Sequence, residues 1–314
     1  MKIVFMGTPQ FAATILEGLY ESGEDIVAVY TQPDKPVKRS GTPVASPVKQ
    51  YALSKGLNVY QPTRIRNAEE VEQLKTFDAD LFVVAAYGQI LSKEVLDIPR
   101  LYCVNAHGSI LPKYRGASPI QRAIANGEEE TGVTLMRMDE GIDTGDMIAV
   151  SKIPIEKDDD EASVYEKLAH VATKLLIDNL KAIEDGTAAF TKQDDALSSY
   201  APMIKKEEGL VDFNKSAHLI DCLVRGFKEW PTAYTFVGGK LLKILEVKEA
   251  SEVTGIGEQG LAPGHFVVTK KNLYVTTGDG LLELLAVKPE GKKLMSGMDY
   301  QRGSHIATGD SAVK

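Results

Sequence analysis

The sequence predicts an α/β protein with a Rossmann-like, mostly parallel sheet in its N-terminal domain and a smaller C-terminal domain built as an OB-like β-barrel. In residues 1–203, short apolar runs alternate with helical patterns, which is typical of βαβ units. In residues 204–314, one helical stretch precedes several short apolar runs separated by glycine-containing turns. We expect the domain boundary near residue 204, where an irregular stretch ends in charged residues.

The N-terminal domain is predicted to alternate strands and helices. Expected strands cover residues 2–6, 26–30, 58–60, 81–86, a run ending within 104–109, 132–138 and 148–153, and expected helices cover residues 9–22, 48–55, 68–76, 118–126 and 163–184. Thr8 fits an N-cap and Pro9 a first helical position. Only Gly7 follows the first strand, so the G-x-G-x-x-G pattern of dinucleotide binding is missing.

The C-terminal domain is predicted to begin with a helix over residues 216–227. Gly238 and Gly239 separate two apolar runs within residues 232–247, which indicates a hairpin. A second turn at residues 270–272 and a third at 278–280 separate further short strands. Short strands joined by such turns predict the barrel.

Composition indicates a globular protein, with 43% hydrophobic and 25% charged residues. No apolar run approaches the ~20 residues of a membrane span, and the one at the N-terminus is too short for a signal peptide, so we expect a soluble cytoplasmic protein. We also expect a monomer. Cys103 and Cys222 lie far apart in the sequence, which predicts neither a disulfide nor a metal site. The net charge is −8, yet residues 35–68 contain seven Lys or Arg and no Asp or Glu, so a local surface could bind phosphates.

Residues 101–116, L-Y-C-V-N-A-H-G-S-I-L-P-K-Y-R-G, contain the strongest functional pattern. Asn105, His107 and Ser109 are spaced by two, so in an extended chain their side chains point to one face. Glycine and proline residues then turn the chain. A polar group at the carboxyl end of a strand is where open α/β sheets place ligand sites.

These residue types indicate acyl-transfer chemistry. Asn105 and His107 can both donate hydrogen bonds to a developing oxyanion. A carboxylate is expected to support the imidazole, and Asp143 in the glycine-rich loop M-D-E-G-I-D-T-G-D is the candidate. Ser109 has no adjacent base in the sequence and Cys103 lies inside an apolar run, so no covalent intermediate is expected. The alternative is a purely structural histidine at the end of a strand.

Two long motifs are similar to a known family. N-A-H-G-S-I-L-P-K-Y-R-G-A-S-P-I-Q-R-A-I, followed by E-T-G-V-T-L-M-R-M-D-E-G-I-D-T-G-D, resembles the signature of the folate-dependent formyltransferases. The segments M-G-T-P-Q-F-A, T-Q-P-D, A-A-Y-G-Q-I-L and G-K-K-L-M-S-G narrow the resemblance to members that act on a charged initiator tRNA. The resemblance covers essentially the whole chain.

The resemblance implies transfer of the formyl group of 10-formyltetrahydrofolate to the α-amino group of methionine on initiator methionyl-tRNA, for translation initiation, without a metal. The implied catalytic residues are Asn105, His107 and Asp143. The implied folate-binding residues are Tyr87, Gly88, Gln89, Ile90, Ser109, Ile110, Leu111 and Pro112. The implied tRNA-binding residues are Lys38, Arg39, Lys205 and Lys206.

The loop of residues 31–48 departs from the family pattern, because R-S-G-T-P follows Lys38 where many relatives have further lysines. Three other functions remain open at this point. The first is a formyltransferase or formyl-folate hydrolase that acts on a small-molecule amine. The second is an RNA-binding module without catalytic activity, and the third is a nucleotide-linked oxidoreductase, which the missing glycine pattern disfavours.

Overall fold

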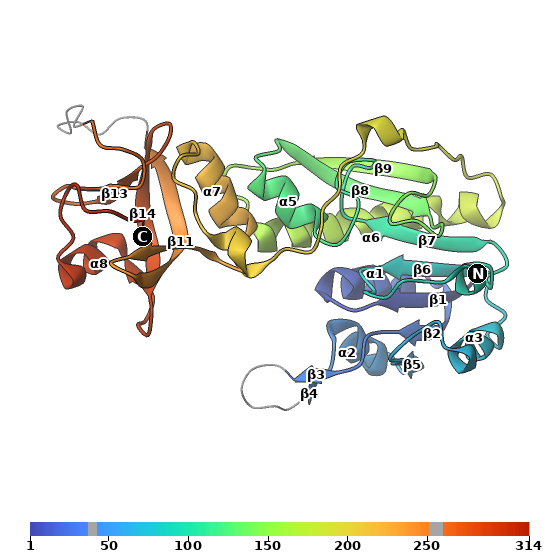
Figure 1. Ribbon diagram of the computed structural model, residues 1–314. Coiled ribbons are helices and arrows are strands. Elements are labelled where there is room, and N and C mark those ends of the chain that lie inside the picture. Colours follow the sequence, from blue (N-terminus) through green and yellow to red (C-terminus); the bar gives the residue numbers. More distant parts are fainter. Residues whose placement is uncertain (37–42, 251–259, 314) are drawn as a thin grey trace. The chain divides into compact units, whose positions relative to one another are not determined.

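The computed structural model describes residues 1–36, 43–250 and 260–313. The chain forms two compact units (Figure 1). The N-terminal unit contains Met1–Pro119, Glu130–Pro154 and Val164–Ala201, and the C-terminal unit contains Ile120–Glu129, Ile155–Ser163 and Pro202–Lys314.

A seven-stranded sheet forms the centre of the N-terminal unit. Its strands are β1 (Lys2–Gly7), β2 (Asp25–Tyr30), β5 (Val59–Tyr60), β6 (Leu81–Ala85), β7 (Tyr102–His107), β8 (Glu130–Arg137) and β9 (Met147–Pro154). Their order is β5-β2-β1-β6-β7-β8-β9, with parallel pairs from β5 to β7 and antiparallel pairs from β7 to β9. The predicted Rossmann-like, mostly parallel sheet is confirmed.

Helices and short strands accompany this sheet along the chain. They are α1 (Gln10–Glu21), β3 (Lys35–Pro36), β4 (Pro43–Val44), α2 (Pro47–Ser54), α3 (Ala68–Lys75), α4 (Lys93–Leu96), α6 (Glu161–Glu184) and η1 (Asp195–Leu197). Helix α5 (Pro119–Ala125) belongs, from Ile120 on, to the C-terminal unit. The core on one side of the sheet contains Val4, Met6, Phe82 and Val84, whose side chains are at most 5% exposed. Because β6 is buried throughout, its sequence is apolar without alternation.

The sheet topology brings two predicted site segments to the same edge. β1 pairs with β2 on one side and with β6 on the other, so the strand order reverses at β1. β6 and β7 are parallel neighbours, with Val84 beside Asn105. The segment that follows β6 and the end of β7 therefore meet at the carboxyl edge of the sheet, where such folds bind ligands.

The start of α1 corrects one prediction. Pro9 is the N-cap, and the helix begins at Gln10, one residue later than expected. The Thr8 hydroxyl donates instead to the backbone carbonyl of Tyr87 at 3.1 Å. The Thr8 side chain is therefore engaged in this long-range contact, and α1 has no side-chain capping hydrogen bond.

An antiparallel sheet forms the C-terminal unit. The elements are η2 (Lys206–Gly209), α7 (Ala217–Gly226), β10 (Ala233–Val237), β11 (Lys240–Ala250), β12 (Phe266–Val268), β13 (Leu273–Thr276), β14 (Leu281–Pro289), β15 (Met295–Ser296) and α8 (Gly297–Ser304). The strand order is β10-β11-β14-β13-β12, with β15 paired to β14. Gly238 and Gly239 have φ values of 55° and 77°, as the predicted two-residue hairpin turn requires.

The predicted OB-like barrel is completed by the C-terminal segment rather than by direct pairing of its outer strands. Within the described residues β10 and β12 are not paired. The Phe266 N–H donates to the Asp310 carbonyl at 2.8 Å, and the Thr235 hydroxyl donates to the Ala312 carbonyl. The chain near residue 311 thus lies between β12 and β10. Helix α7 packs on β11 and places Ile220 and other apolar residues in the core.

Candidate active site

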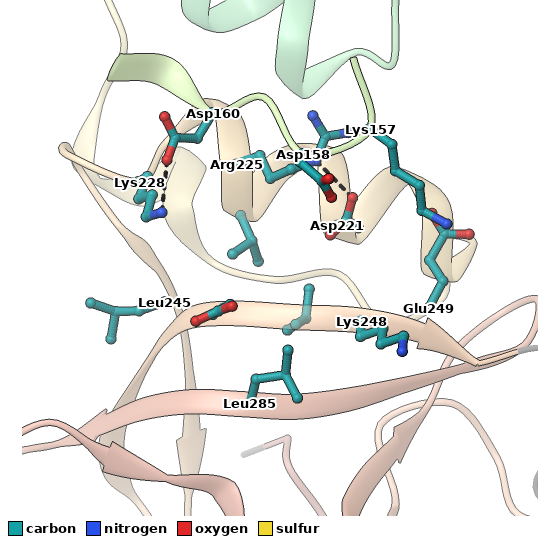
Figure 2. A pocket seen from close by; sticks show the side chains of 13 residues that line it. Lys157, Asp158, Asp160, Asp221, Arg225, Lys228, Leu245, Lys248, Glu249 and Leu285 are labelled. Carbon is teal, nitrogen blue, oxygen red and sulfur yellow. Dashed lines mark hydrogen bonds and ion pairs between the residues drawn. The ribbon is translucent and has the colours of Figure 1, made fainter. Parts of the chain in front are cut away.

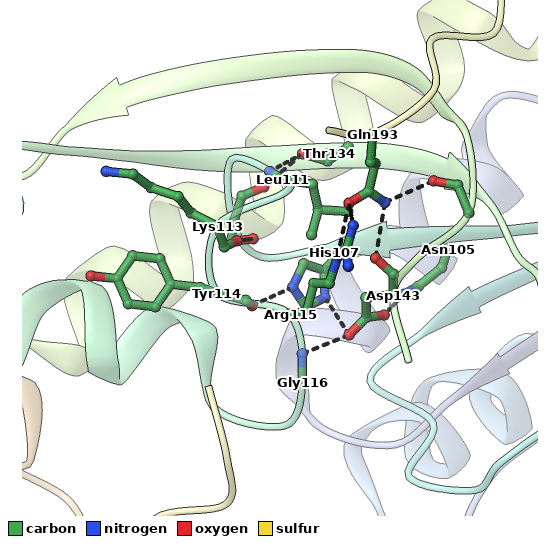
Figure 3. A network of polar contacts seen from close by, with 12 residues as sticks. Asn105, His107, Leu111, Lys113, Tyr114, Arg115, Gly116, Thr134, Asp143 and Gln193 are labelled. Carbon is green, nitrogen blue, oxygen red and sulfur yellow. Dashed lines mark hydrogen bonds and ion pairs between the residues drawn. The ribbon is translucent and has the colours of Figure 1, made fainter. Parts of the chain in front are cut away.

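A polar cluster at the end of β7 has the Asp143 carboxylate at its centre (Figure 3). Its Oδ1 accepts a hydrogen bond from the Asn105 side-chain amide at 3.3 Å, and its Oδ2 lies 3.5 Å from Nδ1 of His107. Oδ2 also accepts a hydrogen bond from the Gly116 N–H at 2.8 Å. The structure thus places Asn105, His107 and Asp143 together, and their catalytic roles remain a prediction.

The His107 imidazole lies between two hydrogen-bond acceptors. Its Nε2 is 2.9 Å from the carbonyl oxygen of Tyr114, which can only accept, so Nε2 carries a hydrogen. Nδ1 faces the carboxylate of Asp143, and the side chain is only 6% exposed. Both ring nitrogens are therefore engaged by the protein. Asn105 keeps one amide hydrogen that the contact with Asp143 does not use.

Left-handed backbone conformations surround this cluster. Asp143 has φ +53°, Tyr114 has φ +60° and Gly116 has φ +114°. Such conformations are uncommon outside glycine, although aspartate tolerates them better than most residues. At Gly116 the space is also limited, because an added Cβ would lie 2.7 Å from Cε2 of Tyr200 and 2.8 Å from the carbonyl oxygen of Ala201.

Gly116→Ala is expected to lower the free energy of unfolding by at least about 2 kcal/mol, since a strained backbone and overpacking each typically cost about 1–3 kcal/mol. Urea-induced unfolding measures the change. Gly186→Ala is the matched control, because its φ of +69° is also left-handed but an added Cβ would have no neighbour within 4 Å. Equal loss of stability in the two variants would contradict the packing argument.

The structure corrects the predicted position of Ser109. β7 ends at His107, and the Ser109 N–H donates to the His107 carbonyl at 2.9 Å, so the chain turns before residue 109. The buried Ser109 hydroxyl donates to the Lys113 carbonyl at 2.7 Å. It therefore closes a turn and does not join the face formed by Asn105 and His107.

Thr134 on β8 holds this turn against the sheet. Its hydroxyl donates to the Ser109 carbonyl at 2.7 Å and accepts from the Leu111 N–H at 3.0 Å. Thr134 is fully buried, and it pairs with His107 across β7 and β8. The segment predicted to bind folate, from Ser109 to Pro112, is thus fixed next to the polar cluster.

The other predicted folate segment follows β6. Tyr87 is buried, and burial raises the pKa of its phenol. Gly88 has φ +81°, and the side-chain amide of Gln89 is bonded to the backbone of residues 62–65. Ile90 is 74% exposed. The segment therefore offers main-chain groups and one exposed apolar side chain, whereas the Gln89 amide is already used.

The predicted tRNA-binding residues are only partly described. Lys38 and Arg39 lie outside the described residues. Lys205 and Lys206 are exposed at the start of η2, where the Lys205 N–H donates to Oε1 of Glu208 at 2.7 Å. Their role in tRNA binding remains a prediction.

Sequence reasoning did not single out three groups that contact the cluster, namely the Gly116 N–H, the Tyr114 carbonyl and the Gln193 side chain. Two of them are backbone groups, which carry no residue-type signal. Gln193 lies in a stretch that was predicted only to be irregular. No spacing rule connects position 193 with position 143.

A separate cavity of about 410 Å³ lies in the C-terminal unit (Figure 2). None of its lining residues belongs to the polar cluster. Much of its charge is paired, with Arg225 bonded to Asp221 at 2.8 Å and Lys228 to Asp160 at 2.7 Å. We assign no function to this cavity.

The described residues contain no group of three or more His, Cys, Asp or Glu side chains arranged to hold a metal ion. Across the same residues, no helix combines the length and the apolar character needed to cross a membrane.

Comparison with known proteins identifies the family. The profile described as "Formyl transferase" matches residues 1–180, and "Formyl transferase, C-terminal domain" matches residues 203–305. The chain belongs to the formyl transferase family. This formyl transferase is 46% identical over 310 residues to the methionyl-tRNA formyltransferase of Agathobacter rectalis, with 98% of each chain covered. It is 44% identical to that of Caldanaerobacter subterraneus subsp. tengcongensis, with 98% of this chain and 99% of the relative covered.

Solved structures support the same fold. The N-formyltransferase from Helicobacter canadensis, in complex with folinic acid and dTDP-3-aminofucose, gives a TM-score of 0.68 at 25% identity, covering 90% of this formyl transferase and 98% of that chain. The sugar 3N-formyl transferase WlaRD gives a TM-score of 0.68 at 23% identity, covering 93% and 99%. At 23% identity, the similarity to WlaRD supports the fold alone.

Proposed function

We propose that this protein transfers the formyl group of 10-formyltetrahydrofolate to the α-amino group of methionine on initiator methionyl-tRNA. The observation that carries the proposal is the Asn105–His107–Asp143 cluster in a chain 46% identical along its length to a methionyl-tRNA formyltransferase. A charged tRNA is favoured over a small-molecule acceptor, because the two sugar N-formyltransferases are only 23–25% identical to this chain.

The reaction exchanges one C–N bond for another. The neutral amine attacks the formyl carbon, and the bond between that carbon and N10 of the folate breaks. The attacking nitrogen loses a proton and the departing folate nitrogen gains one, so no external acid, base or oxidant is consumed. The protein must therefore stabilise negative charge on the formyl oxygen and move one proton.

The cluster contains groups suited to both tasks. Asn105 has a free amide hydrogen that can stabilise the formyl oxygen as charge develops on it. As an imidazolium, with hydrogens on both ring nitrogens, His107 can add a second hydrogen bond from Nδ1, because its 3.5 Å contact with Asp143 is long enough to be exchanged for one to the oxygen. Asp143 is the only carboxylate in the cluster and accepts the proton of the attacking amine, directly or through water.

The segments after β6 and β7 have features that suit a folate. Gly88, with φ +81°, and the turn from Ser109 to Pro112, which Thr134 holds in place, lie at the carboxyl edge of the sheet. Ile90 and Ile142 are 74% and 54% exposed, and an aromatic ring system would cover such apolar side chains favourably. Ile142 precedes Asp143 directly, which places apolar surface next to the carboxylate.

The proposal also covers the roles of the two domains, the cellular compartment and the oligomeric state. We assign catalysis to residues 1–203 and tRNA binding to residues 204–314 together with Lys38 and Arg39. Charged initiator tRNA is used in the cytoplasm, so we place the enzyme there, and we propose that it acts as a monomer. The OB-like fold of the C-terminal domain supports a nucleic-acid partner by analogy.

The substrate assignment is tested with a panel of acceptors. Formyl transfer from 10-formyltetrahydrofolate is measured with methionine-charged initiator tRNA, uncharged tRNA, free methionine and an amino sugar. We expect formylation of the charged tRNA alone. Faster formylation of a small amine, or release of free formate without an acceptor, would contradict the proposed substrate.

Arg39→Ala is expected to weaken the use of charged tRNA, because a phosphate contact contributes through release of counterions. The salt dependence of kcat/KM for tRNA between about 50 and 200 mM should become shallower by roughly one phosphate contact. Lys174→Ala, which removes an exposed charge on α6, is the control. Identical salt dependence in Arg39→Ala and the wild type would exclude the contact.

A further inference from the structure

We propose that Gln193 is a positioning residue, which holds Asp143 in its catalytic orientation through the backbone of the loop that carries it. This inference rests on the role proposed above for Asp143. It concerns a side chain that touches neither substrate nor the reacting atoms, and that lies 50 residues further along the chain.

Every hydrogen-bonding position of the Gln193 amide is used (Figure 3). Nε2 donates to the carbonyl of Asp143 at 2.9 Å and to the carbonyl of Gly145 at 2.7 Å. Oε1 accepts from Nε and Nη2 of Arg115 at 3.0 and 2.9 Å. Because a guanidinium only donates and carbonyls only accept, this network allows one orientation of the amide. The residue is 5% exposed, so water does not compete freely for these bonds.

Asp143 needs such support because its loop has no regular structure. The backbone of Asp143 adopts a left-handed conformation with φ +53°, and the direction of its carboxylate depends on that conformation. Within the loop, Oδ1 of Asp139 accepts from the Gly141 N–H and from the Thr144 hydroxyl. Those bonds shape the loop but do not connect it to the rest of the unit, whereas Gln193 does.

The contacts form a closed ring of four residues. From the carbonyl of Asp143 the bonds run to Gln193 and then to Arg115, which is followed in sequence by Gly116, whose N–H returns to Oδ2 of Asp143. The consecutive residues Arg115 and Gly116 thus hold Asp143 at two points, its backbone through Gln193 and its carboxylate directly. Gln193 itself is fixed two residues away, where Thr191 and Met147 exchange backbone hydrogen bonds at 2.8 and 2.9 Å.

The ring predicts the consequence of losing Gln193. Catalytic groups must stay within a fraction of an ångström of the productive geometry, so a shift of the Asp143 loop should reduce the chemical step without affecting distant binding contacts. An effect that acts only through Asp143 should also disappear when the Asp143 carboxylate has been removed. A general structural role would have neither property.

The test is Gln193→Glu, alone and combined with Asp143→Asn. The new carboxylate keeps an acceptor for Arg115 but places an oxygen against two carbonyls, so it breaks only the bonds to the loop. We expect kcat to fall by about 10–100-fold, as for other outer-shell partners, with KM for both substrates within about twofold. In the Asp143→Asn background the same change should have no further effect on kcat.

Asp195→Ala is the matched control. The exposed Asp195 carboxylate accepts from Nη2 of Arg115 at 2.8 Å but does not touch the loop, so kcat should stay near the wild-type value. Thermal unfolding is measured for every variant. If Gln193→Glu is unfolded at the assay temperature, Arg115→Lys replaces it with the same expectations, because lysine cannot make the two-point contact with Oε1.

The outcomes separate this inference from the proposed function. Unchanged kcat in folded Gln193→Glu overturns the positioning role, and so does an equal further loss of kcat in the Asp143→Asn background. Near-wild-type activity of Asp143→Asn alone overturns the proposed mechanism instead.

Discussion

Asp143→Asn is expected to lower kcat by about 10²–10⁴-fold, equivalent to roughly 3–5 kcal/mol of barrier. The asparagine oxygen can still accept from the Gly116 N–H, so that contact with the neighbouring segment is preserved. The neutral amide cannot accept the proton of the attacking amine, and it no longer places a negative charge beside His107. Steady-state kinetics with both substrates at saturation measure the loss.

The matched control for Asp143→Asn is Asp146→Asn in the same loop. Asp146 forms a partly exposed ion pair with Arg137 at 2.7 Å and has no contact with the cluster. We expect its kcat to be close to that of the wild type, since exposed pairs contribute little to stability. Comparable kcat values for the two variants would remove Asp143 from the chemistry.

Asn105→Ala is expected to lower kcat by about 10²–10³-fold, which is the typical loss when one oxyanion donor is removed. The alanine keeps the β7 backbone pairing with Val84 and Met136 but lacks the amide hydrogens. KM for each substrate should change little, because the donor acts mainly as negative charge develops on the formyl oxygen. Single-turnover formylation measures the effect.

The control for Asn105→Ala removes an amide that makes no comparable contact. Asn67 is the N-cap of α3, yet its side chain forms no capping hydrogen bond. Asn67→Ala should therefore leave kcat unchanged. If Asn105→Ala lowers kcat/KM for tRNA but leaves kcat normal, Asn105 acts in binding the acceptor and not in stabilising charge.

Regular elements with a strong pattern were predictable from the sequence. Residues 81–85 are apolar throughout because β6 is buried, and Ser216 caps α7 where a helix was expected to start. α8 was not predicted, since its sequence G-M-D-Y-Q-R-G-S has glycines near both ends and little apolar periodicity. Its Ser296 cap, which accepts from the Asp299 N–H, is a signal that could have found it.

The candidate site was predictable where residue type carries the chemistry. Asn105, His107 and Asp143 have side chains that can donate to an oxyanion or accept a proton, and the structure brings them together. Ser109 was misplaced because a period of two holds only while the strand continues, and the chain turns after His107. Gln193 could not be inferred, since its contacts with the Asp143 loop are to backbone carbonyls that any residue at those positions would offer.

The measurement that tests the account most directly is single-turnover transfer of labelled formyl from 10-formyltetrahydrofolate to methionine-charged initiator tRNA, by the wild type and by Asp143→Asn. Binding of both substrates is measured in parallel. The proposed mechanism predicts rapid transfer by the wild type, and for the variant unchanged affinities with transfer slowed by at least about 10²-fold. Equal transfer rates for the two proteins at saturation would contradict it.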